Sequence, residues 1–176
     1  MRMFARCTAA LLGMTAGAMF LAPSAHGDST LLTCEGEQTA SYSPAMKNKE
    51  QTLTATVAEN YDHCASSPDG IRGGEGTASF KEKASCLLTA EPGRTDEIQY
   101  IWDAGKKTST VKFSVTNVVR AGDGTTTVTS VGDVTDGLGA GGKATRVVVL
   151  PALDLAACSD DGVPSQKGTA TLKFVG

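Results

Sequence analysis

The segment with the most direct chemical signature runs from Gly137 to Thr145, with the sequence GLGAGGKAT. Its glycines fit the G-x-G-x-x-G pattern of dinucleotide-binding loops, and Lys143 nearly completes a Walker A loop. Both loops require a following helix, whose N-terminus holds the phosphates. Here the β-branched, proline-containing sequence ATRVVVLPAL follows, and Ala144 replaces the hydroxyl residue of Walker A. We therefore predict a glycine-rich turn, with no nucleotide and no other cofactor.

Residues that could carry catalysis are sparse elsewhere. His63 is the one histidine beyond the N-terminal segment, and it neighbours Cys64, which is expected in a disulfide. A Ser-His-Asp triad would depend on this single histidine. Most acidic residues, Asp96 among them, fall in segments with turn chemistry. The cysteines lack zinc spacing and the acidic residues lack EF-hand spacing, so we predict no catalytic residue and no metal site.

Polar and aromatic residues on the inward side of predicted strands are the strongest candidates for a binding site. Alternation places the following residues there: Tyr42, Glu82, Tyr100, Trp102 and Asn117. A buried polar group costs a few kcal/mol unless it is paired, so one hypothesis is a cavity that orients a small ligand. Glu82 would be the acid or base of a barrel-type isomerase or cyclase. The alternative is that bulges reverse the parity and that strand ends are wet.

The segment 63–74 is long and polar, and it is anchored by Cys64. A disulfide-anchored loop that exposes Ile71 or Arg72 would fit a protease inhibitor. An ordinary surface loop is the alternative.

The N-terminal 27 residues have the pattern of a secretory signal peptide. Arg2 and Arg6 form a charged start, an apolar run covers residues 7–22, and small residues precede a predicted cleavage after Gly27. The apolar run is shorter than the ~20 residues of a membrane-spanning helix. We therefore expect a secreted, extracellular protein with one domain, residues 28–176, and no membrane span after cleavage.

Net charge argues against nucleic-acid binding. Cleavage would remove two arginines and no acidic residue, which lowers the formal net charge from −3 to −5. A mildly acidic surface without a basic stripe repels phosphate backbones.

The predicted fold is all-β. Period-two alternation recurs along the chain, as in STVKFSVTNVV. We predict eight strands near residues 30–43, 51–62, 75–90, 96–103, 107–120, 124–135, 144–156 and 168–175. Most connections are short, so consecutive strands should be antiparallel neighbours. Such a meander buries its apolar face by closing, fully or nearly, into a barrel, and a β-sandwich is the alternative.

Four cysteines in an exported domain imply two disulfides. In the meander, Cys34 and Cys64 lie at one end of the sheet, while Cys86 and Cys158 lie at the other. A disulfide requires Cα atoms within about 7 Å, so we predict the pairs Cys34–Cys64 and Cys86–Cys158.

The order of motifs LTCEG, YDHC, SCLL, VVVLPALDLAAC and GTATLKF resembles a group of small secreted proteins of high-GC Gram-positive bacteria. The resemblance covers essentially all of the exported domain. It implies a shared fold, a cysteine framework and export, and it implies no catalytic residue.

These observations favour a secreted, non-enzymatic binding or surface-interaction module. Its partner would be a small apolar ligand in the barrel or an extracellular protein. The alternatives from other classes are the protease inhibitor and the isomerase or cyclase.

Overall fold

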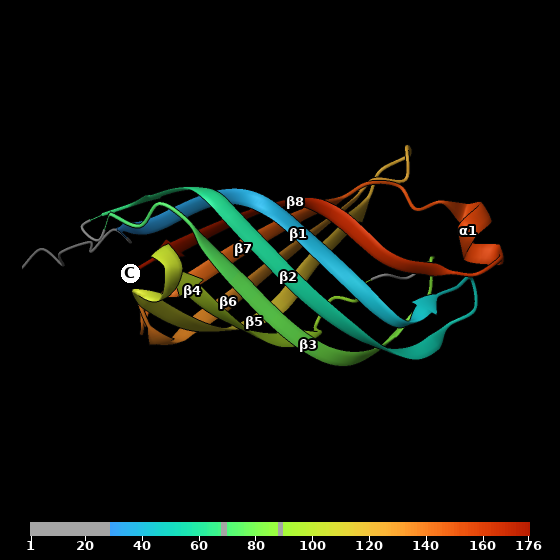
Figure 1. Ribbon diagram of the computed structural model, residues 1–176, viewed down its shortest axis with the longest axis horizontal. Helices are drawn as coiled ribbons and strands as arrows, with labels where there is room; N and C mark the ends of the chain where they lie inside the picture. Colours follow the sequence, from blue (N-terminus) through green and yellow to red (C-terminus); the bar gives the residue numbers. More distant parts are fainter. Residues whose placement is uncertain (1–28, 68–69, 88–89) are drawn as a thin grey trace, which may run out of the picture.

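The computed structural model describes residues 29–67, 70–87 and 90–176, so the predicted signal peptide lies outside the described residues. Eight antiparallel strands follow one another around a closed barrel, in which β1 pairs with both β2 and β8 (Figure 1). The predicted meander, and its closure into a barrel rather than a sandwich, are confirmed. The elements are β1 Thr30–Met46, β2 Gln51–Ser66, β3 Gly74–Ala84, β4 Thr95–Trp102, η1 Asp103–Gly105, β5 Lys107–Arg120, β6 Thr126–Gly137, β7 Lys143–Leu150, α1 Leu155–Ser159 and β8 Val163–Val175.

Alternation along each strand decides which side chains enter the barrel. In β4, for example, Asp96, Ile98, Tyr100 and Trp102 are buried, and the residues between them are exposed. This is the pattern of an antiparallel strand with one face on a core and one in solvent. The GLGAGGK segment is the predicted turn, since it connects β6 directly to β7.

Both predicted disulfides are present. Cys34 and Cys64 face each other across β1 and β2, with Cα atoms 4.1 Å apart. Cys86 is joined to Cys158 of α1, with Cα atoms 6.3 Å apart. The first disulfide lies toward the barrel end that holds the C-terminus, and the second lies toward the opposite end, beside α1 (Figure 1).

The third strand is shorter than predicted, because it ends at Ala84 and not near residue 90. The backbone N–H of Cys86 instead donates to the carbonyl of Lys47, outside the strand ladder. Ala90 is buried against Val115 and Val128. Cys86 and Ala90 are therefore buried outside the β3 ladder, although the alternation in sequence continues past Ala84.

The predicted inward position of Asn117 is wrong. The β5–β6 register shifts between Val115 and Asn117, so Thr116 is an extra residue in β5. Such a bulge reverses the parity of the residues after it. Asn117 is consequently exposed, and Val119 is 52% exposed on the same outer face.

The barrel interior divides into two halves of different composition. The first, which we call the aromatic half, holds the largest buried rings: Tyr61, Tyr100, Trp102, Phe113 and Phe174. The indole of Trp102 stacks on Tyr100, with ring centroids 5.2 Å apart. The second, which we call the small-residue half, is built on Ala40, Ala55, Val57 and Ala84 and includes the Cys86–Cys158 disulfide. Side-chain volume therefore differs sharply between two parts of one continuous sheet.

The barrel wall is loosest between β3 and β4. β3 pairs with β2 along its whole length, from Gly74 to Ala84. It pairs with β4 only from Gly74 to Thr77. Beyond Thr77 the two strands separate, and we call this part of the wall the seam.

Candidate functional site

A chain of buried charges crosses the barrel between its two halves. The guanidinium of Arg146 donates from Nη1 to Glu59 Oε1 over 3.2 Å and from Nη2 to Asp96 Oδ2 over 3.3 Å. The three side chains are at most 3% exposed. Paired charges of this kind are the form in which a barrel core tolerates ionised groups, because an isolated buried charge is very costly.

The aromatic half holds one end of this chain. The hydroxyl groups of Tyr61 and Tyr100 both donate to Glu59 Oε2, over 2.9 and 3.1 Å. Burial, and next the Glu59 carboxylate, raise the pKa of both phenols well above their usual range. Burial lowers the pKa of Arg146, but the carboxylate of Glu59 offsets this effect and holds that pKa above its ordinary value. The phenols therefore act as permanent donors and Arg146 as a permanent cation.

The other end of the chain reaches the seam. Arg94 lies 4.0 Å from Asp96 Oδ2 and donates to Glu82 Oε2 over 2.5 Å. Its guanidinium also covers the ring of Phe80, 4.6 Å from the ring centroid. Burial raises the pKa of Glu82, and the charge of Arg94 opposes that rise. Five ionisable groups, three carboxyls and two guanidiniums, thus run from the aromatic half to the seam.

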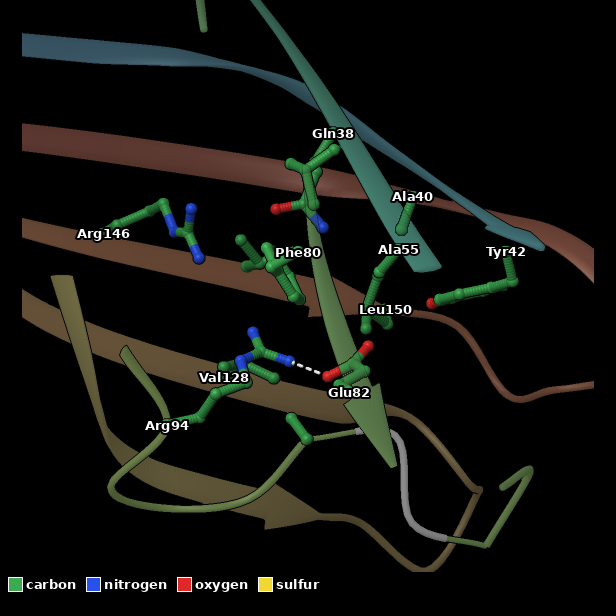
Figure 2. Close-up of a pocket in the computed structure, with 13 residues that line it drawn as sticks. Gln38, Ala40, Tyr42, Ala55, Phe80, Glu82, Arg94, Val128, Arg146 and Leu150 are labelled. Atoms are coloured by element: carbon green, nitrogen blue, oxygen red, sulfur yellow. Dashed lines mark hydrogen bonds and ion pairs between the residues drawn. The ribbon is translucent and has the colours of Figure 1, made fainter. Parts of the chain in front are cut away.

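A small cavity of about 40 Å³ lies beside the two arginines, in the small-residue half. Figure 2 shows Arg146, Gln38, Tyr42 and the Glu82–Arg94 ion pair around it. Its lining residues are Gln38, Ala40, Tyr42, Ala55, Val57, Phe80, Glu82, Ala90, Arg94, Val128, Arg146, Val148 and Leu150. The site is thus mixed, with apolar walls and convergent polar groups.

Several buried polar atoms of the cavity wall have no hydrogen-bond partner among the described residues. They are Gln38 Oε1, Arg94 Nε and Arg146 Nε. Asp96 Oδ1 is also buried without a hydrogen-bond partner, but Asp96 does not line the cavity. Buried polar atoms in native proteins are normally satisfied by protein groups or by bound molecules. Three side chains that line the cavity therefore each carry an unsatisfied polar atom, one acceptor and two donors.

The structure separates the predicted cavity residues into three groups. Tyr42 and Glu82 line the cavity. Tyr100 and Trp102 point inward as predicted, but they fill the aromatic half: the Trp102 indole donates to Ser109 Oγ and the Tyr100 hydroxyl donates to Glu59. Asn117 lies outside the barrel because of the bulge at Thr116.

Sequence reasoning missed most of the charged chain. Asp96 was predicted in a turn, but it is an interior residue of β4. Glu59 lies between Val57 and Tyr61 on the inward side of β2. Arg146 likewise lies on the inward side of its strand, β7. The signal was present, since a charged residue at inward parity must find a partner of opposite charge inside.

The proposed inhibitory loop is not displayed as that hypothesis requires. β2 extends to Ser66, and the buried Ile71 is only 3% exposed, with its N–H bonded to Ser66 Oγ. Arg72 is exposed, but its carbonyl accepts from the N–H of Cys64 and its own N–H donates to Asp103. The connection is thus fixed to the barrel, with its apolar residue inside.

Comparisons with known proteins add no functional information. No family model matches the chain, and no curated protein or solved structure shows significant similarity to it.

Within the described residues, no helix has the length and apolar character needed to cross a membrane. Two disulfides are typical of proteins that fold in an oxidising compartment.

Proposed function

We propose that the protein is an exported binding module whose barrel takes up a small polar molecule beside Arg94 and Arg146. One observation carries this proposal: Gln38, Arg94 and Arg146 line one cavity, and each has a buried polar atom, Gln38 Oε1, Arg94 Nε and Arg146 Nε, without a partner among the described residues. An occupant that both accepts and donates hydrogen bonds would satisfy all three. The unsatisfied polar atoms of the wall favour such a molecule over the apolar ligand expected from the sequence.

Cavity size limits the ligand. A water molecule needs at least 10–15 Å³ of such space, so about 40 Å³ holds roughly three waters or a molecule of about five non-hydrogen atoms. Pockets that enclose whole drug-sized ligands are several times larger. The proposed ligand is therefore very small, or it is the polar end group of a larger molecule.

The seam is the proposed entrance. Glu82 and Arg94 line the cavity and also a groove of about 510 Å³ that includes Lys81, Pro92 and Gly93. Their ion pair, the dashed contact in Figure 2, thus borders both spaces. Movement of the Arg94 side chain alone would connect the cavity to the groove.

A thermal-shift experiment with simple probes tests the proposal. Acetate, urea, glycine, ethanolamine and glycerol cover anionic, neutral, zwitterionic and cationic groups of the right size. A probe present at about ten times its Kd should stabilise the fold by about 1.4 kcal/mol, which raises the Tm by about 3 °C. Ala40→Val is the control variant, because it fills the cavity without removing a polar group.

The outcomes separate binding from general solvent effects. A shift in the wild-type protein that is lost in Ala40→Val supports the proposal. Absence of any shift, or equal shifts in both proteins, overturns it. A crystal structure that shows only water at Gln38 Oε1 would then identify the cavity as a hydration site.

Export is the second part of the proposal, and the two disulfides support it. Expression of the full chain in a secreting bacterial host should release a protein whose N-terminus is Asp28, measurable by mass spectrometry. Retention of the intact chain in the cytoplasm would contradict this part without affecting the binding experiment.

A further inference from the structure

The seam leaves two strand edges facing each other without a backbone ladder. The β3–β4 register pairs Gly74 with Trp102 and Thr77 with Gln99. Continued in the same register, it would place Glu82 opposite Arg94. These two side chains do meet, but within the described residues no ladder joins β3 beyond Thr77 to β4. Beyond Thr77, the contact between the two sides of the seam is therefore made by side chains and not by a backbone ladder.

The seam is open enough to expose side chains that point inward. Ala78, Phe80 and Glu82 have inward parity, yet they are only half-buried. Inward residues of β4, which pairs along its whole length with β5, are buried. The groove of about 510 Å³ lies on the outer side of this opening, between residues 81–83 and 91–94.

We propose that the seam takes up an extended peptide segment as an added strand between β3 and β4. Unpaired N–H and C=O groups on a strand edge are a template for another backbone, and strand addition is a known mode of peptide recognition. Within the described residues, two strand edges lack a ladder partner at the seam, Ala78–Ala84 of β3 and Thr95–Ile98 of β4, and the groove lies along the first of them at residues 81–83. An extended chain can bond to both edges at once, which a helix or a compact ligand cannot do.

Charge on the outer face selects the kind of segment. Lys81 and Lys83 are exposed on β3 beside the groove, and the described residues give neither lysine an ion-pair partner. Because Arg94 is paired with Glu82, the remaining charges of the groove are these two lysines and the exposed Glu91, which leaves the groove net positive. Opposite charges on directly opposed residues stabilise a strand pair, and like charges destabilise it. The added strand should therefore carry acidic residues on its outward face.

The same lysines argue against a second copy of this chain as the occupant. Antiparallel pairing of two β3 strands would bring Lys81 and Lys83 of the two copies together. Lysines on an exposed edge are a common device against such self-association. The occupant is thus an acidic extended segment of another chain.

Hydrogen exchange with a designed peptide tests this inference. The probe is Thr-Glu-Thr-Glu-Thr-Glu-Thr, which has strand propensity and acidic residues on one face. In the free protein, alternate amides of residues 78–84 should exchange fast, because they face the seam. The probe should slow their exchange, and that of residues 95–98, at least tenfold. Amides of β2 should be unaffected because they are already paired.

Two controls distinguish strand addition from simple charge attraction. A peptide with proline at its centre keeps the charge but cannot pair, so it should give no protection. Lys81→Glu/Lys83→Glu should weaken binding of the probe at least tenfold, whereas Lys173→Glu on β8 should not. Neither lysine lines the cavity, so this result is independent of the interior ligand.

Three results would overturn the inference. They are protection of the seam-facing amides of residues 78–84 without peptide, equal protection by the proline peptide, and absence of added protection at millimolar probe.

Discussion

The aromatic half and the small-residue half belong to one sheet, but their interiors are filled to different degrees. In the aromatic half, Tyr100, Trp102 and Phe174 contact one another edge-on or stacked, and each is fully buried. In the small-residue half, Ala40 and Ala55 leave a cavity that polar side chains border. The sheet is therefore a common frame, and side-chain volume decides where the interior is solid.

The difference also separates stability from binding. Large buried rings contribute most of the apolar area that drives folding. Small side chains leave room, but they bury less. The charged chain of Glu59, Arg146 and Asp96 lies at the boundary and is held by tyrosines from the aromatic side. The solid half thus positions the groups that the open half presents.

Removal of Arg146 should have the largest effect on this arrangement. Arg146→Met leaves Glu59 and Asp96 buried without their cation, and breaking a buried pair in this way costs about 3–5 kcal/mol. Urea unfolding measures the change. Lys173→Met on the outer surface is the control and should lie within about 0.5 kcal/mol of the wild-type protein.

A triple variant sharpens that experiment. Glu59→Gln/Asp96→Asn/Arg146→Met removes all three charges, so it should recover part of the loss of Arg146→Met. If Arg146→Met alone costs less than about 1 kcal/mol, the charged chain does not hold the two halves together.

The sequence predicted the strand order and the disulfide pairs better than the contacts inside the barrel. Alternation and short turns are local signals, and they predicted the meander, from which the two disulfide pairs followed. They favoured closure into a barrel but left a β-sandwich as the alternative. The cavity depends on which inward residues meet across the barrel, such as Arg146 and Glu59, which are 87 residues apart. Alternation places each residue inside but does not give this pairing. Asn117 shows a second limit, because one bulged residue, Thr116, reversed its parity without a sequence signal.

Added volume should be tolerated differently by the two halves. A Cβ at Gly76 would lie 2.5 Å from Cε1 of Tyr100, so Gly76→Ala should cost about 1–3 kcal/mol through overpacking. Ala40→Val adds more volume but faces the cavity, so it should cost less than about 1 kcal/mol. Equal costs in urea unfolding would show that both halves are equally solid.

Tyrosine titration should distinguish the halves without any substitution. The three tyrosines of the chain are Tyr42, Tyr61 and Tyr100. Burial raises the pKa of Tyr42, beside the cavity, to about 12. Burial, and next the charge of Glu59, also raise the pKa values of the two phenols that donate to Glu59 well above their usual range. Phenolate absorbance should thus be absent near pH 10, the usual value, and the first tyrosine should ionise near pH 12.

The same shift has a consequence for stability. Because the folded pKa of Tyr42 is raised, its contribution is complete below about pH 10 and is lost as the pH rises through about 12. Phenolate absorbance equal to about half of one tyrosine at pH 10 would show that the small-residue half is open to solvent.

The smallest expected effect concerns Glu82, where burial and Arg94 act in opposite directions on one carboxyl. Its folded pKa is raised above the unfolded value of about 4.3, so the folded protein binds this proton more tightly. The resulting stability is complete below that pH and is lost as the pH rises through the folded pKa. The free energy of unfolding of the wild-type protein, minus that of Glu82→Gln, should therefore fall as the pH rises. A rise instead would mean that the charge of Arg94 outweighs burial at this carboxyl.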